Sequence, residues 1–400
     1  MKQFINAKEN MVTEAIDGAI ASSGGALTRL DGYPHLRVVV RADWDKTKVA
    51  LVSGGGSGHE PAHAGFVGAG MLTAAVCGDV FASPSVAAVL AGILAVTGPA
   101  GCLLIVKNYT GDRLNFGLAA ERARAFGYKV SMVIVDDDVA LPDLPQARGL
   151  AGTLFVHKIV GAMAENGATL AACTSAAQRV VNGCRSIGMS LDTCTVPGSV
   201  KEDRIPEDMA ELGLGIHGEA GVQQVSCLGA QDAVAKVVDK LSVTLPNTPH
   251  VVLVNNFGGT SVLEMSILTH DLLSSPIGEQ VQLIVGPASM MTALDMHGFS
   301  ISMMELAEGD AALLAQPVSC AGWPGCHRVQ APALLPLPSA VPPPGRAPLA
   351  PTVALPPPLL LPSFAAVDVF VFIAVSGIPT PEPVGLLWGR VLPSSSMRDL

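Results

Sequence analysis

The sequence predicts two tandem α/β domains with mixed sheets, followed by a proline-rich tail. Three observations support this fold class. From residue 48 onward, short apolar runs that end in glycines alternate with amphipathic stretches, which is the pattern of strands that lead into helices. The 42 glycines and only 3 tyrosines and 3 tryptophans indicate many tight turns around an aliphatic core. At about 150 residues per domain, 400 residues favour two or three domains.

The first predicted domain covers residues 1–195. Ser83 before Pro84 is the expected N-cap of its first helix, which would bury a face of valines and leucines from Val86 to Leu94. The other expected elements are strands at 48–53, 102–107 and 130–135 and helices at 112–126, 149–166 and 169–183. This order predicts a parallel arrangement with functional groups at the carboxyl ends of the strands.

The second predicted domain covers residues 196–329. It contains a glycine-rich loop at 213–221. Its expected elements are helices at 231–241 and 261–273 and strands at 250–255, 281–285 and 299–305, the last being the final strand.

The tail, residues 330–400, has a different composition. Residues 331–400 contain 16 of the 30 prolines and six charged residues. Proline at this density blocks helices and sheet ladders, so we expect a disordered, apolar tail; a proline-rich docking segment is the alternative.

Charge and cysteine usage restrict the class of protein. With 24 basic and 34 acidic residues, a net charge of −10 argues against binding nucleic acid or an anionic membrane. No apolar run of about 18 residues predicts a membrane span, and the N-terminus lacks the features of a signal peptide. The eight cysteines show no C-x-x-C pair, so we expect reduced cysteines in a cytoplasmic protein.

The segment S-G-G-G-S-G-H-E at 53–60 is the first candidate site. Its glycines would let backbone amides approach a small polar ligand, although a plain tight turn is the alternative. No lysine follows in the P-loop position. His59 and His63 fit the zinc pattern H-E-x-x-H, but Pro61 breaks the helix that this pattern requires, so we predict no metal site.

Three further clusters follow predicted strands or glycines. Asp112, in K-N-Y-T-G-D-R at 107–113, is either a helix N-cap or a general base beside the glycine loop. Residues 136–138 are three aspartates, expected to form a solvated turn, with a cation site as the alternative. His217 lies among glycines, either as a plain loop residue or as a base, ligand or nucleophile that Glu219 orients. The other histidines, at 35, 63, 157, 250, 270, 297 and 327, have no comparable context.

Together these segments resemble the dihydroxyacetone kinase family. The resemblance rests on residues 53–66, 107–116 and 213–221, with support from 254–259 and 294–301, and runs to about residue 324. It covers the substrate-binding portion of the family, two α/β domains in tandem.

The resemblance implies a chemistry for these residues. His217 would add to the carbonyl of dihydroxyacetone and form a covalent hemiaminal. Asp112 would act as general base for the phosphorylated hydroxyl, with His59 as a further catalytic residue. Substrate contacts are implied for Gly56, Ser57, Gly58, His59, Lys107 and Asp112.

Nothing in residues 331–400 resembles the helical domain that binds ATP and Mg²⁺ in ATP-dependent members. The resemblance therefore implies that this chain binds no cofactor itself. ATP, or a nucleotide recharged by a phosphocarrier protein, and Mg²⁺ would belong to a helical nucleotide-binding domain or subunit. The chain would be either the subunit of a split kinase or part of a single-chain enzyme, and a homodimer by resemblance. The alternative is a catalytically silent triose-binding or regulatory subunit.

Overall fold

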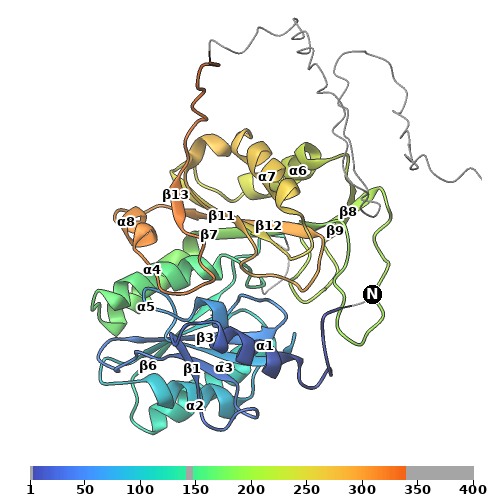
Figure 1. The fold of residues 1–400 in the computed structure, drawn as a ribbon. Helices are drawn as coiled ribbons and strands as arrows, with labels where there is room; N and C mark the ends of the chain where they lie inside the picture. Colours follow the sequence, from blue (N-terminus) through green and yellow to red (C-terminus); the bar gives the residue numbers. More distant parts are fainter. Residues whose placement is uncertain (1–2, 141–146, 339–400) are drawn as a thin grey trace, which may run out of the picture. The chain divides into compact units, whose positions relative to one another are not determined.

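The computed structural model describes residues 3–140 and 147–338. Residues 1–330 form one compact unit that contains two β-sheets (Figure 1). Both sheets are mixed, so the predicted fold class is confirmed. The predictions for the tail fall mostly outside the described residues, because these end at residue 338.

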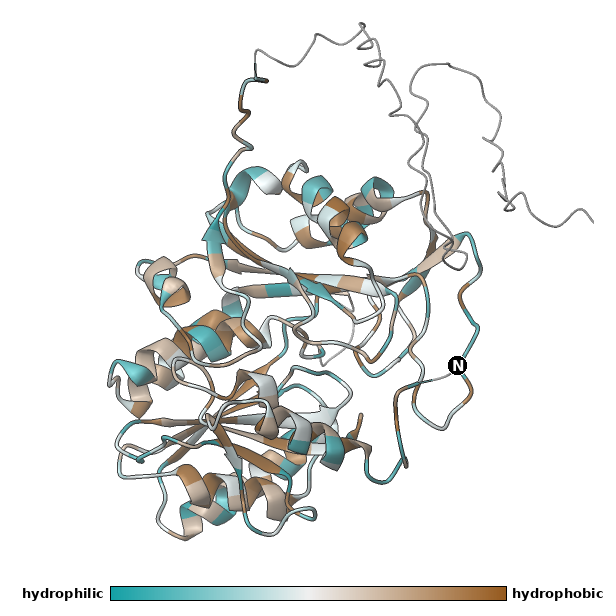
Figure 2. Ribbon diagram, in the orientation of Figure 1, coloured by the Kyte–Doolittle hydropathy of each residue, from teal (hydrophilic) through white to brown (hydrophobic). Residues whose placement is uncertain are grey.

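The first sheet carries the glycine loop. Its strands lie in the order β1-β2-β4-β3-β5-β6, and β4, β3, β5 and β6 run parallel to one another. The strands are β1 (Leu27–Arg29), β2 (Val38–Arg41), β3 (Ala50–Ser57), β4 (Ala74–Val80), β5 (Cys102–Lys107) and β6 (Val130–Val135). Strands β3 and β5 are buried along their whole length, and most of their residues are hydrophobic or glycine, as is usual for central parallel strands (Figure 2).

The second sheet has the order β13-β11-β10-β12-β7-β8-β9. Only β10 and β11 pair in parallel. The strands are β7 (Cys184–Ser190), β8 (Met209–Leu212), β9 (Gln223–Ser226), β10 (His250–Asn256), β11 (Val281–Ala288), β12 (Gly298–Glu305) and β13 (Cys326–Arg328). Strand β7 belongs to the second sheet, although it lies before residue 195, where we placed the boundary between the two domains. That boundary stays a prediction.

Helices pack on both faces of both sheets. Helices α2 and α3 cover one face of the first sheet, α1, α4 and α5 pack into the core between the sheets, and α6 and α7 cover the far face of the second sheet (Figure 1). The helices are α1 (Met11–Ala21), α2 (Val86–Val96), α3 (Thr110–Ala125), α4 (Thr153–Glu165), α5 (Leu170–Gly183), α6 (Ala230–Ser242), α7 (Val262–Leu273), α8 (Asp310–Ala315) and the short 3₁₀ helices at Ala64–Phe66 and Gly278–Gln280.

Three local predictions are wrong. The N-cap of α2 is Ser85, whose Oγ accepts from the Ala88 amide, and not Ser83, which lies in the extended segment before it. Of the predicted buried face of α2, Val89 and Ile93 are buried as expected, whereas Val86, Leu90 and Leu94 are only partly buried. Strand β13 follows the strand that we predicted to be last.

The cysteines are free in the described part of the chain, five of them buried and three partly exposed. Burial raises the pKa of Cys102 to about 12, which is expected of an inert core thiol. Within residues 3–140 and 147–338, no helix combines the length and apolar character needed to cross a membrane.

Candidate active site at the glycine loop

The glycine loop at the end of β3 is shaped by contacts that exclude side chains. A Cβ on Gly55 would lie 2.9 Å from Lys107 Nζ and 3.3 Å from Asp112 Oδ2. Gly58 has φ +98°, and a Cβ there would lie 2.9 Å from the Phe81 ring. The backbone therefore approaches charged and aromatic groups more closely than any other residue would allow.

We predict that Gly58→Ala disturbs the site far more than Gly127→Ala. Gly127 also has positive φ, +90°, but a Cβ there meets nothing within 4 Å. Both alanines should cost about 1–2 kcal/mol of unfolding free energy for the left-handed backbone. Only Gly58→Ala should also displace Phe81, whose ring stacks on His59 with centroids 5.1 Å apart. Urea unfolding measures the first effect, and the imidazole proton shifts of His59 measure the second. Equal effects of the two variants on His59 would contradict the close packing.

His59 is fully buried at the end of this loop. Its Nδ1 lies 2.7 Å from the Thr292 carbonyl oxygen, which can only accept, so Nδ1 carries the proton. Burial, with the charges of His217 and Lys107, lowers the pKa of His59 well below its usual value, so the ring is neutral. Nε2 has no hydrogen-bond partner among the described residues. His59 therefore presents an unused acceptor nitrogen.

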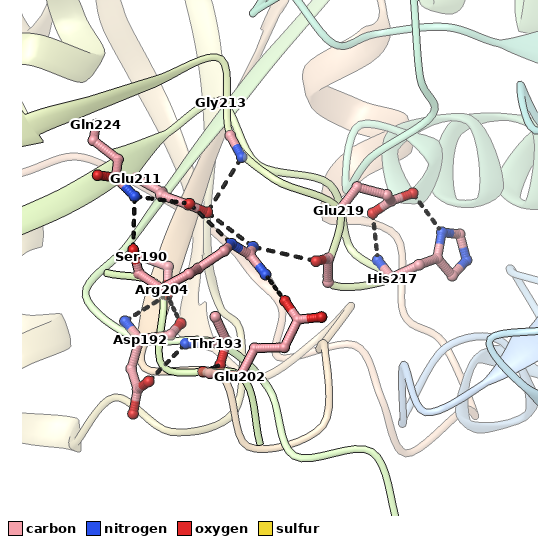
Figure 3. A network of polar contacts seen from close by, with 12 residues as sticks. Ser190, Asp192, Thr193, Glu202, Arg204, Glu211, Gly213, His217, Glu219 and Gln224 are labelled. Atoms are coloured by element: carbon pink, nitrogen blue, oxygen red, sulfur yellow. Dashed lines mark hydrogen bonds and ion pairs between the residues drawn. The ribbon is translucent and has the colours of Figure 1, made fainter. Parts of the chain in front are cut away.

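His217 comes from the second sheet's side of the site, in the loop that follows β8. Its Nδ1 lies 3.2 Å from Glu219 Oε1, and its backbone amide donates to Glu219 Oε2 at 2.9 Å (Figure 3). Although burial raises the pKa of Glu219, the hydrogen bonds from His217 lower it to about 2, so the carboxylate is ionised. Glu219 thus holds the proton on Nδ1 and leaves the Nε2 lone pair free, as a nucleophile requires.

Two arginines hold the loop that carries His217. Arg204 binds both carboxylate oxygens of Glu211, at 2.9 and 3.0 Å, and donates to the Gly218 carbonyl at 3.2 Å (Figure 3). Arg148 pairs with Asp138 and donates to the Gly213 carbonyl at 2.6 Å. The planar guanidinium groups fix the loop on both sides of His217.

Aromatic rings surround the His217 imidazole. The ring centroids of Tyr109, His59 and Phe81 lie 4.4, 4.8 and 5.4 Å from that of His217, all edge to face. Phe81 has φ +57°, an uncommon conformation for a bulky residue and one that is often found at functional sites. Sequence reasoning assigned no role to Phe81 or Tyr109. The position of Tyr109, directly after a buried strand, was the available signal.

Lys107 and Asp112 lie next to Gly55 of the glycine loop. Lys107 ends β5 and is 1% exposed; Asp112, 4% exposed, is in the first turn of α3. The N-cap of α3 is Tyr109, so the N-cap role considered for Asp112 is wrong. Asp112 Oδ1 has no hydrogen-bond partner among the described residues. A buried carboxylate oxygen that faces no donor is available to accept a proton.

The substrate contacts that the resemblance implies for Gly56 and Ser57 stay predictions. Ser57 Oγ donates to the Gly78 carbonyl at 2.9 Å. Both residues line a hollow of about 420 Å³ between α1 and the glycine loop, and His59, Lys107, Asp112 and His217 do not line it. We place the candidate site at His217, whose ring contacts those of His59 and Tyr109, while Asp112 lies by the same glycine loop, next to Gly55.

The three aspartates at 136–138 do not form a solvated turn. Asp136 is exposed, but Asp137 and Asp138 are buried. Asp137 accepts from the amides of Leu150 and Gly152 and from Ser186 Oγ. Burial raises the pKa of Asp137 to about 6 against these hydrogen bonds. Asp137 and Asp138 therefore join the end of β6 to residues 148–152 and to β7. The position of the aspartates after an apolar strand did not predict this structural role.

Across the described ranges, no group of three or more His, Cys, Asp or Glu side chains is arranged to hold a metal ion. His59 and His63 are engaged elsewhere, by Thr292 and by Lys107.

Comparisons with known proteins identify the family of this chain. The Dak1 domain family model matches residues 18–322. The dihydroxyacetone kinase of Citrobacter freundii is 52% identical over 326 residues, which cover 80% of this chain and 59% of that protein. The dihydroxyacetone-binding subunit DhaK of a PTS-dependent dihydroxyacetone kinase from Listeria innocua is 40% identical over 334 residues, 81% of this chain and all of that subunit.

A solved structure extends the similarity to the fold. The crystal structure of the C. freundii dihydroxyacetone kinase superimposes with a TM-score of 0.83 at 49% identity, covering 85% of this chain and 63% of that one. The chain therefore belongs to the Dak1 family, the family of the dihydroxyacetone kinases. It spans 59% of the length of the C. freundii kinase.

Proposed function

We propose that this chain is the substrate-binding part of a dihydroxyacetone kinase. The observation that carries the proposal is the environment of the His217 imidazole. Glu219 fixes its tautomer so that the Nε2 lone pair is free, and three aromatic rings enclose it. Relatives of the same family carry the names of dihydroxyacetone kinases and of a dihydroxyacetone-binding subunit.

Capture begins at the carbonyl carbon of the triose. The Nε2 lone pair of His217 forms a bond to this carbon, the carbonyl π electrons move to oxygen, and the oxygen takes a proton from solvent to give a hemiaminal. The positive charge that develops on the imidazole faces the ionised Glu219, which lies 3.2 Å from Nδ1. His59 Nε2 is free to accept a hydrogen bond from a substrate hydroxyl. Glycerol has no carbonyl, so covalent capture selects against it.

Phosphoryl transfer then requires a base for the terminal hydroxyl. Asp112 Oδ1 accepts the hydroxyl proton while the oxygen attacks the terminal phosphorus of the donor and the bond to the donor's leaving oxygen breaks. We propose that ATP or a recharged nucleotide, together with Mg²⁺, is brought by a helical nucleotide-binding domain or subunit. We also propose that the chain acts in the cytoplasm as a homodimer.

A crystal soaked with dihydroxyacetone tests the proposal. We expect continuous electron density between His217 Nε2 and the central carbon of the triose. A soak with glycerol is the matched control and should give no such bond. A triose bound away from His217 would remove the covalent mechanism, and no bound triose would remove the proposed substrate.

A catalytically silent binding or regulatory subunit is the alternative. A protein that only binds the triose requires His217, but it does not require a general base such as the buried Asp112 carboxylate, whose Oδ1 has no hydrogen-bond partner among the described residues. The position of Asp112 over Gly55 therefore favours the enzyme.

A further inference from the structure

A chain of three basic groups extends from the site into the core. Lys107 Nζ lies 2.7 Å from His63 Nε2, and His63 Nδ1 lies 3.1 Å from His157 Nε2. The three residues come from β5, from the turn after the glycine loop and from α4, and they are 1%, 4% and 0% exposed. His63 is the second histidine of the H-E-x-x-H pattern, to which the mechanism above gives no role.

The proton positions in this chain follow from the donors and acceptors. An ammonium group only donates, so His63 Nε2 must carry a lone pair, and His63 Nδ1–H then donates to His157 Nε2. Asp112 and Asp137 favour the charged form of Lys107, although burial, the larger effect, lowers its pKa. In the ammonium form of Lys107, the hydrogen bonds are donated from Lys107 to His63 and from His63 to His157.

The two imidazoles do not take the proton from Lys107. Burial, followed by the charge of Lys107, lowers the pKa of His157 to about 3 and that of His63 well below its usual value. A neutral His63 is thus a fixed acceptor for the lysine amino group. His157 fixes the tautomer of His63, because His157 Nε2 accepts the hydrogen bond from His63 Nδ1–H.

We propose that His63, supported by His157, is a positioning residue that holds the Lys107 amino group over Gly55, beside Asp112. This inference rests on the proposed function, because it assigns Lys107 a role in triose binding. A lysine side chain has several rotatable bonds, and the contact with His63 is the one hydrogen bond that we find for Nζ among the described residues. With this contact, the remaining N–H donors point at a defined place in the site.

The binding test is a double-mutant cycle on the full chain, measured by calorimetric titration with dihydroxyacetone. His63→Leu removes the acceptor and should weaken triose binding by about 10- to 100-fold, the usual effect of losing a hydrogen bond to a charged group. His63→Gln, which can offer a carbonyl oxygen near the same place, should stay within about threefold of the wild type. In a Lys107→Met background, His63→Leu should have almost no further effect. Additive losses, or wild-type binding by His63→Leu, would overturn the inference.

A second measurement does not depend on the triose. In the ¹⁵N spectrum of labelled histidine, His63 Nε2 should resonate as an unprotonated, hydrogen-bonded nitrogen, and Lys107→Met should shift it. A protonated Nε2, or a signal that Lys107→Met leaves unchanged, contradicts the inference even if His63→Leu fails to fold. If the wild type binds no triose while this signal behaves as expected, the proposed function fails and the Lys107–His63 contact stands.

Discussion

Replacing His217 with glutamine is expected to abolish capture of dihydroxyacetone by this chain. The side chain keeps a similar size and can still hydrogen-bond to Glu219, but its amide has no nucleophilic lone pair. Binding should weaken by about 10³-fold or more, because a covalent bond is replaced by the few contacts that a triose offers. Calorimetric titration of the full chain measures the loss, and a soaked crystal of the variant should lack the covalent density.

His297 provides a matched control. Its Nε2 lies 2.9 Å from Glu264 Oε1, so the chain contains a second histidine–glutamate pair, on the side of α7. His297→Gln should leave triose binding within about twofold of the wild type, as is usual for a surface substitution. If His217→Gln and the wild type bind equally, the histidine is not the nucleophile and the site must be sought elsewhere.

Most of the site residues that the first sheet contributes could be predicted, because they lie at or just after the ends of its strands. The glycine loop follows β3, and Lys107 and Asp112 follow β5, which pairs with β3 in parallel. Because neighbouring parallel strands end at the same edge, the two motifs had to meet. His217 was different: its loop belongs to the second sheet, and its spacing alone left a plain loop residue as an equal alternative.

The undetected parts of the site depend on contacts between distant segments. His63 and His157 are 94 residues apart, and His59 binds a carbonyl 233 residues away. No local pattern marks such pairs, so His63 had no visible context in the sequence. Phe81 was missed for another reason, since an aromatic residue in an apolar segment is usually part of the core and its positive φ is not encoded by its type.

Strand β7 was not predicted either, because its buried polar residues depend on contacts with distant segments. Its inward Ser186 and Ser190 hydrogen-bond to Asp137, Ser302 and backbone carbonyls, so they are buried without being apolar. The hydrophobic alternation that predicts a strand is therefore interrupted. Strand β5, which is apolar up to its last residue, Lys107, was predicted at its observed bounds.

Asp112→Asn should separate binding from turnover. Asparagine has the shape of aspartate but cannot take the proton of the attacking hydroxyl, so triose binding should be kept while the rate of phosphorylation falls by about 10²- to 10⁴-fold. The measurement is a coupled kinase assay in which a helical nucleotide-binding domain from a relative is added to the full chain, with triose binding followed in parallel. The chain without that domain should show no ATP-dependent turnover.

Asp232 controls for the electrostatic effect of a carboxylate in the first turn of a helix. It occupies the first turn of α6 and pairs with Lys236, as Asp112 occupies the first turn of α3. Removing either charge should lower the melting temperature modestly through the helix dipole. Only Asp112→Asn should lose turnover, since only Asp112 has a buried, unpartnered oxygen beside Lys107 and the glycine loop. If Asp112→Asn turns over near the wild-type rate, its carboxylate supports the helix alone, and the silent triose-binding subunit becomes the better account of this chain.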